Sequence, residues 1–364
     1  MKICYLAPAN NPHTIKWCNY FKSKGHEVYL ISFVPGNVEG IITHNILFDK
    51  GIENKGNFVK LKYILQINKI KRIIEDIKPD ILHAHYATSY GIIGSLSNYH
   101  PYILSVWGSD VYDFPQISPF HKKLVEYNLK KADYILSTSF HMKKETEKYT
   151  NKHIEITPFG VDVNKFKPIP SFKSNNRDQF VIGTIKTLKP KYGIEYLIKA
   201  FKILKRSYPE KNLKLKIAGK GEQKEELQQL CRDLQIQADV EFLGFLPEQE
   251  VIHTFNTFDV AVFPSDSESF GVAAVEAQAC GLPVIVSNVG GLPEATSPNI
   301  TSLLVERKNE KELANAIERL MLDDKLRKKL GINARSFVLE HYNIEDNFKD
   351  VETLYQKVVN NNEV

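Results

Sequence analysis

Two glutamates eight residues apart lie in the segment FPSDSESFGVAAVEAQACGLP, residues 263–283. Glu268 follows a short apolar run and a polar loop, and Glu276 lies within an alanine-rich stretch that is typical of a helix. A carboxylate at the second position can accept hydrogen bonds from two vicinal hydroxyls. The spacing alone fits a capping acid followed by a buried helix equally well.

The alanine-rich helix is expected to begin between Ser269 and Gly271. The first N–H groups of a helix have no partner inside it and lie at the positive end of its dipole. The amides of Phe270, Gly271 and Val272 would therefore form an anion site suited to a phosphate. One glutamate could then hold a sugar and the other a ribose, with a phosphate between them.

Short apolar runs bounded by turn residues alternate with helical stretches along the whole chain. In the first half they span residues 2–8, 27–33, 80–86, 101–107, 134–139 and 154–160, and in the second half 180–186, 213–219, 240–245, 260–265, 282–288 and 301–306. Strands that alternate with helices form parallel sheets covered on both faces. The sequence therefore predicts an α/β chain with two Rossmann-like, doubly wound sheets.

A segment rich in Pro, Ser and Asn separates the two halves and reads as a linker. The predicted organisation is an N-terminal domain over residues 1–165, a linker over 166–178, a C-terminal domain over 179–342 and a final helix over 343–364 that returns to the N-terminal domain. Ligands of parallel sheets bind beyond the carboxyl ends of the strands. The chemistry is therefore expected in strand-to-helix turns that line a cleft between the domains.

Positive charge is concentrated in the first half of the chain. Residues 1–165 contain 21 Lys and Arg against 15 Asp and Glu, whereas the remainder contains 27 against 28. This asymmetry favours an anionic partner, either a phosphorylated acceptor or an acidic membrane surface to which the chain binds peripherally. The clearest source of the positive charge is the stretch 55–78. A solvated face of a helix explains this stretch more simply than an anionic partner does. No basic and aromatic module of the kind that binds nucleic acid is present.

Composition excludes several classes of protein. The 364 residues contain 43% hydrophobic and 25% charged residues, which is typical of a globular chain with two domains. No apolar run approaches the roughly 20 residues of a membrane span, and the first residues do not resemble a signal peptide. We therefore expect a cytoplasmic protein, acting in solution or at the inner face of the membrane. The four cysteines are too scattered to predict a disulfide framework or a zinc site.

The segment SESFGVAAVEAQACGLPVIVSNVGGLPE, residues 267–294, resembles the E-x7-E signature of family 4 of the retaining glycosyltransferases. Three further segments resemble motifs of the same family: DILHAHYA (80–87), TPFGVDVNKFKP (157–168) and IAGKGEQKEEL (217–227). The resemblance extends over nearly the whole chain. It implies the GT-B fold, in which two Rossmann-like domains face a central cleft.

The resemblance places the sugar donor in the C-terminal domain. Family members clamp the nucleotide diphosphate with an Arg and a Lys five residues apart, and Lys186 and Lys191 have this spacing. The fit is imperfect, because Lys lacks the bidentate fork of Arg and because Tyr192 stands where the family has Lys. The implied donor-binding residues are Lys186, Lys191, Gly219, Lys220, Phe245, Leu246, Glu268, Ser269, Phe270, Gly271, Val272 and Glu276.

Within that set, Gly219 and Lys220 are expected to approach the nucleotide. Phe245 and Leu246 are expected to flank the base and to offer backbone groups to a uracil-like edge. Packing in the core of the domain is the alternative for these last two residues.

The implied acceptor side, in the N-terminal domain, departs further from the family. Many members have two glycines in the first loop, where this chain has side chains that form hydrogen bonds: Asn10, Asn11, His13 and Thr14. Trp107 replaces the histidine of a His-Gly-x-Asp motif, whose remaining positions are Gly108, Ser109 and Asp110. Trp can donate through its indole N–H and stack on a sugar, although packing is the commoner role at a strand end.

Two histidines occur near the end of the strand in the DILHAHYA segment. We expect His83 and His85 to point to opposite faces, so that only one of them lines the cleft. His85, together with Tyr86, is the predicted acceptor-side residue.

The resemblance implies retaining transfer of a hexosyl or N-acetylhexosaminyl group from an α-linked nucleotide-sugar, for which we expect a UDP-sugar. The acceptor would be a glycan, a lipid-linked molecule or a small molecule, and the product an α-glycoside. Glu268, Lys186, Lys191 and Asp110 are the predicted catalytic residues. No metal or other cofactor is expected, because the lysines and the helix terminus would stabilise the leaving diphosphate. The family is described as using front-face attack, in which the leaving phosphate oxygen takes the acceptor proton.

Two alternatives belong to other classes. A sugar-nucleotide epimerase can share this fold, but it needs acid and base residues that the transferase pattern does not explain. A non-catalytic subunit of a glycosyltransferase complex would tend to lose the lysine pair and the acidic pair, and all four residues remain here. Release of free nucleotide together with glycosylation of an acceptor would distinguish the transferase from both.

Overall fold

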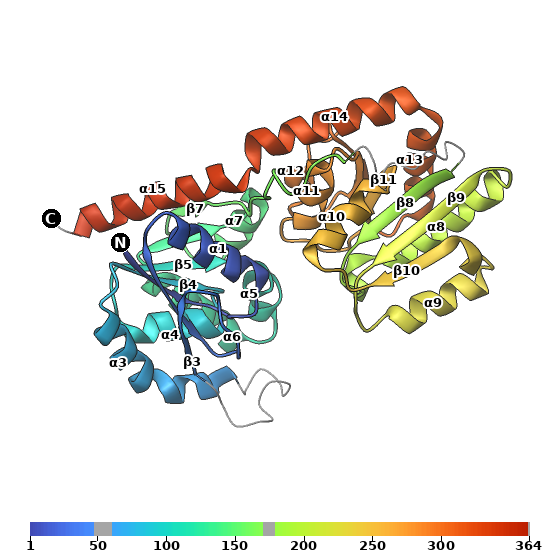
Figure 1. Ribbon diagram of the computed structural model, residues 1–364. Coiled ribbons are helices and arrows are strands. Elements are labelled where there is room, and N and C mark those ends of the chain that lie inside the picture. Colours follow the sequence, from blue (N-terminus) through green and yellow to red (C-terminus); the bar gives the residue numbers. More distant parts are fainter. Residues whose placement is uncertain (47–59, 170–178, 363–364) are drawn as a thin grey trace. The chain divides into compact units, whose positions relative to one another are not determined.

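The computed structural model describes residues 1–46, 60–169 and 179–362, with the side chains of 60–62 and 362 excepted. The chain forms two compact units (Figure 1). Unit 1 consists of Met1–Phe159 together with Asp346–Val364, and unit 2 consists of Gly160–Glu345. Each unit is built on its own parallel sheet.

The sheet of unit 1 has seven parallel strands in the order β3-β2-β1-β4-β5-β6-β7. They are β1 (Lys2–Leu6), β2 (Glu27–Ser32), β3 (Ile42–Asn45), β4 (Ile81–His85), β5 (Tyr102–Val106), β6 (Tyr134–Ser137) and β7 (Ile154–Ile156). Six of them lie within the predicted runs. The sequence missed β3, because it is a four-residue edge strand with only one strongly apolar side chain.

Helices cover both faces of this sheet. They are α1 (Pro12–Ser23), α3 (Ile67–Ile77), α4 (Ser89–Ser97), α5 (Ser109–Tyr112), α6 (Pro119–Lys131) and α7 (Phe140–Thr146), with the 3-10 helices η1 (Lys60–Gln66) and η2 (Phe114–Gln116). One core lies between the sheet and the helices α3, α4 and α6, which contribute side chains such as Ile74, Ile93 and Leu129. The basic stretch 55–78 therefore forms, within the described residues, η1 and an amphipathic helix whose apolar side is buried.

The other face of the sheet is covered by α1 and by the terminal helix α15 (Ile344–Asn362), drawn in red in Figure 1. The ring of Phe348 contacts Trp17 at 5.3 Å between centroids, and Tyr355 stacks on Phe21 at 5.0 Å. The hydroxyl of Tyr355 bonds to Nδ1 of His83 on β4, at 2.5 Å. The last helix is therefore part of the core of unit 1.

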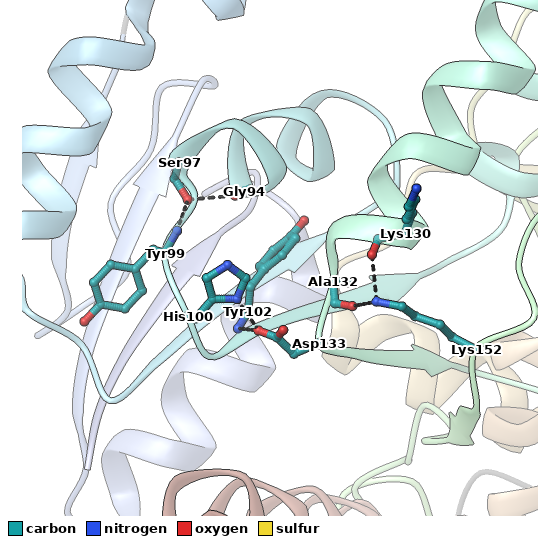
Figure 2. Close-up of polar contacts among 9 residues, drawn as sticks. All are labelled: Gly94, Ser97, Tyr99, His100, Tyr102, Lys130, Ala132, Asp133 and Lys152. Atoms are coloured by element: carbon teal, nitrogen blue, oxygen red, sulfur yellow. Dashed lines mark hydrogen bonds and ion pairs between the residues drawn. The ribbon is translucent and has the colours of Figure 1, made fainter. Parts of the chain in front are cut away.

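Polar contacts fix the amino ends of β5 and β6 (Figure 2). The carboxylate of Asp133 accepts from the Tyr102 amide at 2.8 Å and bonds to Nδ1 of His100 at 2.7 Å. The ammonium of Lys152 donates to the carbonyls of Lys130 and Ala132, at 2.7 and 2.5 Å. These carbonyls lie at the end of α6, where the helix dipole favours a cation.

The sheet of unit 2 has six parallel strands in the order β10-β9-β8-β11-β12-β13. They are β8 (Gln179–Ile185), β9 (Asn212–Ala218), β10 (Val240–Gly244), β11 (Val260–Phe263), β12 (Val284–Ser287) and β13 (Ser302–Val305). The helices are α8 (Ile194–Ser207), α9 (Lys224–Asp233), α10 (Glu248–Asn256), α11 (Val272–Ala279), α12 (Leu292–Ala295), α13 (Glu310–Leu322) and α14 (Asp324–His341), with turns η4 (Pro190–Tyr192) and η5 (Gln237–Asp239). The prediction of two doubly wound parallel sheets is confirmed.

Residues 160–166 are attached to unit 2. The guanidinium of Arg335 on α14 donates to the carbonyls of Phe166 and Val163, at 2.7 and 2.9 Å. The Val161 amide donates to the Tyr342 carbonyl at 2.8 Å. The division between the units therefore falls before Gly160, earlier than residue 165. Most of the expected linker, residues 170–178, lies outside the described residues.

Candidate functional site

Lys186 and Glu268 form an ion pair beyond the carboxyl ends of two neighbouring strands of unit 2. Lys186 follows β8 and Glu268 follows β11, and these strands pair with each other. The Nζ to Oε2 distance is 2.5 Å, and the two side chains are 16% and 10% exposed. The fold thus brings together two residues that lie far apart in the sequence and that were both predicted to be catalytic.

Lys191 lies on the turn after β8, and its backbone is fixed to the loop that carries Glu268. The Lys191 carbonyl accepts from the amides of Asp266 and Ser267, at 2.9 and 3.3 Å. Gly193 has a φ of 62°, and a Cβ at this position would lie 2.1 Å from the carbonyl oxygen of Pro264. The close approach of the two loops therefore requires glycine.

The glycine turn after β9 lies against the same region. Gly219 has a φ of 138°, and a Cβ there would lie 1.9 Å from the Lys186 carbonyl oxygen. A Cβ on Gly221 would lie 2.0 Å from the carbonyl oxygen of Leu188. The predicted residues Gly219 and Lys220 are therefore held beside Lys186.

Phe245 and Leu246 follow β10, next to this turn. The ring of Phe245 is 64% exposed and lies under the ammonium of Lys220, 5.2 Å from the ring centroid. Leu246 is half-buried. Core packing, the alternative for this pair, is therefore wrong for Phe245, whose exposed ring can stack on a planar group.

Helix α11 begins at Val272, and Gly271 with a φ of 108° is its N-cap. Ser269 and Phe270 precede the helix. The Phe270 ring is buried against Tyr342, with centroids 5.3 Å apart, so that Phe270 could contact a ligand only through its backbone. Glu276 lies in the second turn and is half-buried.

In unit 1, Asn11 links the first loop to the loop after β4. Its Oδ1 caps α1 by accepting from the amides of His13 and Thr14, at 2.8 and 3.4 Å. Its Nδ2 donates to the hydroxyl of Tyr86 at 3.2 Å. Asn10, beside it, is exposed, whereas Thr14 is fully buried. Asn11 and Tyr86 are thus brought together as part of one surface.

His13 and Trp107 belong to an aromatic cluster. The His13 ring stacks on Phe159 at 4.2 Å, and burial, with Lys16 nearby, lowers the pKa of His13 to about 4. Trp107 contacts the rings of His85 and Tyr86 at 4.2 and 5.0 Å and is only 7% exposed. The surroundings of Trp107 therefore favour a packing role over direct contact with a sugar.

The expectation that His83 and His85 point to opposite faces of β4 is wrong. Residues two apart in a strand lie on the same face, and the two rings contact each other at 4.8 Å. Both also contact Trp17, at 5.2 Å. Both are fully buried, and burial lowers the pKa of His83 to about 3 and that of His85 well below its usual value. His85 therefore does not line an open surface of unit 1.

Asp110 is buried, and its carboxylate accepts hydrogen bonds from backbone amides on two loops. These are the amides of Ala87, Gly108 and Trp107, at 2.8, 2.7 and 3.2 Å. Burial raises the pKa of Asp110, and these hydrogen bonds oppose the rise. These hydrogen bonds hold the two loops in position, whereas the neighbouring Ser109 is exposed. The catalytic role of Asp110 stays a prediction.

Within residues 1–46, 60–169 and 179–362, no group of three or more His, Cys, Asp or Glu side chains could hold a metal ion. In the same part of the chain, no helix is both long and apolar enough to cross a membrane.

Comparison with known families assigns both halves of the chain. Residues 2–139 match the family model described as glycosyl transferase 4-like, and residues 166–337 match that of the glycosyl transferases group 1. D-inositol 3-phosphate glycosyltransferase of Corynebacterium jeikeium is 31% identical over 289 residues, which cover 72% of this chain and 68% of that protein. The chain belongs to the group 1 glycosyltransferases.

A second relative of this glycosyltransferase is N-acetyl-alpha-D-glucosaminyl L-malate synthase of Bacillus anthracis. It is 26% identical over 361 residues, which cover 92% of this chain and 90% of the relative. Family 4 membership, expected from the E-x7-E segment, is confirmed, and the protein is a glycosyltransferase.

Solved structures confirm the GT-B fold. Sucrose-phosphate synthase of Thermosynechococcus elongatus superposes with a TM-score of 0.86 at 20% identity, over 98% of both chains. HepE of Anabaena, solved in complex with UDP-glucose, superposes with a TM-score of 0.78 at 21% identity, over 98% of this chain and all of HepE. At these identities the likeness concerns the fold alone.

Two structural contacts of this glycosyltransferase were not predicted from the sequence. A Cβ on Gly290 would lie 1.7 Å from the Glu268 carbonyl oxygen, which also accepts from the Gly291 amide at 3.1 Å. The second contact is that of the Tyr192 ring with the ammonium groups of Lys186 and Lys191. The sequence shows the paired glycines and shows Tyr192 between a lysine and a glycine. It does not show that the glycines contact Glu268 or that the Tyr192 ring contacts Lys186.

Proposed function

We propose that this glycosyltransferase transfers a sugar from an α-linked nucleotide-sugar to an acceptor hydroxyl with retention of configuration and without a metal. The bond between the sugar C1 and the diphosphate oxygen breaks, and a bond between C1 and the acceptor oxygen forms. The acceptor proton passes to the leaving phosphate oxygen. The products are an α-glycoside and a nucleoside diphosphate.

The observation that carries this proposal is the convergence of Lys186, Lys191 and Glu268 at the carboxyl edge of one sheet. The two lysines provide fixed positive charge where negative charge develops on the leaving diphosphate. Glu268, which pairs with Lys186, provides a carboxylate for the transferred sugar as it gains positive character. Glu276, in the second turn of α11, is the proposed ribose contact.

The proposed donor is a UDP-sugar. HepE, which shares the fold, has been solved with UDP-glucose. The exposed ring of Phe245 next to Lys220 suits a planar base beside a diphosphate. The Gly219 to Gly221 turn allows the donor to approach the backbone closely.

The proposed acceptor carries negative charge. The two relatives are named for D-inositol 3-phosphate and L-malate, which are small hydroxylated anions. The first half of this chain has six more basic than acidic residues, so that it would attract such a molecule or an acidic lipid-linked acceptor. Peripheral association with an anionic membrane and a cytoplasmic location remain predictions, which sedimentation with anionic vesicles and cell fractionation would test.

The test combines binding and turnover. UDP-, GDP- and ADP-sugars are screened by thermal shift, because a ligand at 100 times its Kd adds about 2.7 kcal/mol of apparent stability. The stabilising donor is then incubated with hydroxylated anions, and nucleotide release and the anomeric signals of the product are followed. We expect acceptor-dependent UDP release and an α-linked product. A β-linked product, or interconversion of the donor without acceptor, would contradict the proposal.

A further inference from the structure

The ring of Tyr192 lies under two ammonium groups that belong to the proposed diphosphate site. The Nζ of Lys186 is 4.5 Å from the ring centroid, and the Nζ of Lys191 is 5.3 Å from it. Since both nitrogens lie over one ring, they are within about 10 Å of each other. Like charges at such a separation repel each other weakly in water, so that their own interaction would not bring the two flexible side chains together.

Among the described residues, a carboxylate partner is found for one of these two lysines. Lys186 pairs with Glu268 at 2.5 Å, whereas Lys191 makes no ion pair with any other residue of this part of the chain. An aromatic face attracts a cation through its quadrupole and does not neutralise it. Tyr192 is therefore the group that both lysines share, and it leaves both charges available to an anion.

The backbone that carries the ring is held in place by the turn. Tyr192 ends the turn η4 (Pro190–Tyr192), and its amide donates to the Lys189 carbonyl at 3.0 Å. Gly193 next to it has the positive φ and the close approach to Pro264 described above. The ring therefore sits on a rigid turn, whereas the lysine side chains above it have several rotatable bonds.

We propose that Tyr192 is a positioning residue of the diphosphate site, whose ring holds the ammonium groups of Lys186 and Lys191 together and still charged. This inference rests on the proposed binding of a nucleotide-sugar. When a diphosphate arrives, Lys186 can exchange the Glu268 carboxylate for a phosphate oxygen and keep its contact with the ring. The tyrosine thereby performs, for two lysines, part of the ordering that the bidentate fork of an arginine provides.

The experiment compares diphosphate binding with nucleoside binding. UDP, GDP and ADP are titrated into the wild-type protein by calorimetry, and the tightest of them and its nucleoside are then titrated into the variants. In Tyr192→Leu, which removes the ring, we expect the diphosphate to bind about tenfold more weakly, a loss of about 1.4 kcal/mol. The affinity for the nucleoside should change less than twofold. In Tyr192→Phe, which keeps the ring, both affinities should stay within twofold.

Tyr196→Leu is the matched control. Tyr196 lies on α8 under the ammonium of Lys199, 5.0 Å from its ring centroid, so that this variant removes the same type of contact from a lysine that pairs with Glu195. We expect normal diphosphate affinity in this control.

The outcomes separate the inference from the proposed function. If the wild-type protein binds none of the three diphosphates, the proposed function and this inference both fail. If it binds one of them and Tyr192→Leu binds it equally well, only the inference fails. It also fails if Tyr192→Phe loses as much affinity as Tyr192→Leu, or if nucleoside binding falls in parallel with diphosphate binding.

Discussion

At the scale of single residues, the two glutamates of the opening segment have different surroundings. Glu268 pairs with Lys186, and its carbonyl holds Gly291, whereas Glu276 lies half-buried in the second turn of α11. A contact that tightens as the sugar gains positive charge affects kcat, and a contact that is the same in ground and transition states affects KM.

We therefore expect Glu268→Gln to lower kcat at least tenfold, which is about 1.4 kcal/mol. Affinity for UDP should be retained or increased, because Lys186 is released from its partner. Glu276→Ala should mainly raise the KM for the donor. Steady-state kinetics and calorimetry with UDP provide the measurement, and normal turnover by Glu268→Gln together with a loss of kcat alone in Glu276→Ala would reverse the assignment.

Lys191→Ala tests the lysine clamp directly. Loss of one charge-assisted contact should weaken UDP binding by about 1.5–3 kcal/mol, with little change in stability, since this side chain is exposed. Lys189→Ala is the control, because Lys189 is an exposed lysine on the same turn. Equal losses in the two variants would indicate general electrostatic attraction, and an unchanged affinity in Lys191→Ala would place the clamp elsewhere.

At the scale of elements, buried histidines of α1 and β4 link pH to the stability of unit 1. Both nitrogens of His83 bond to hydroxyls, those of Tyr355 and Ser105. Burial lowers the pKa of His83 to about 3 and that of His13 to about 4, against about 6.5 in the unfolded chain. The unfolded state therefore binds more protons below pH 6.5, and stability falls as the pH decreases from there toward 4.

We expect each of these histidines to cost on the order of 1 to 2 kcal/mol of stability between pH 7 and pH 5. The measurement is convenient, because the two tryptophans of the chain, Trp17 and Trp107, both lie in unit 1. Unfolding followed by tryptophan fluorescence should shift to lower denaturant at pH 5, and a midpoint independent of pH over this range would show that the histidines bind protons equally in the folded and unfolded states.

Periodicity and turn residues predicted most of the elements, because a strand buried on both faces is a continuous apolar run. The strand β3 was not predicted, because three of its four residues are Thr, His and Asn. The donor-side lysines and glutamates could be predicted, since they follow strands in recognisable segments. The ring contacts of Trp107 and the hydrogen bonds of Asp110 could not be predicted, because they involve neighbours from other strands and loops.

At the scale of the whole molecule, we expect the complete transfer reaction to proceed without a metal ion. If the lysines stabilise the leaving diphosphate, excess EDTA should change the rate by less than about twofold, because the stabilising positive charge then comes from the protein and not from a metal ion. The measurement is the rate of nucleotide release with and without chelator. Loss of activity that Mg²⁺ or Mn²⁺ restores would show that the clamp is not the main source of charge stabilisation.

The terminal helix has a consequence for synthesis on the ribosome. Tyr355 completes the cluster around Tyr5 and His83, yet residues 160–345 are made between the strands of unit 1 and this helix. At typical elongation rates that interval lasts on the order of 10 to 40 s. During it, one face of the first sheet is covered by α1 but lacks α15, while unit 2, encoded without interruption, can complete its core. The unit that is begun first is therefore finished last, and a nascent chain that stops shortly before residue 346 would leave the apolar side of α1 uncovered.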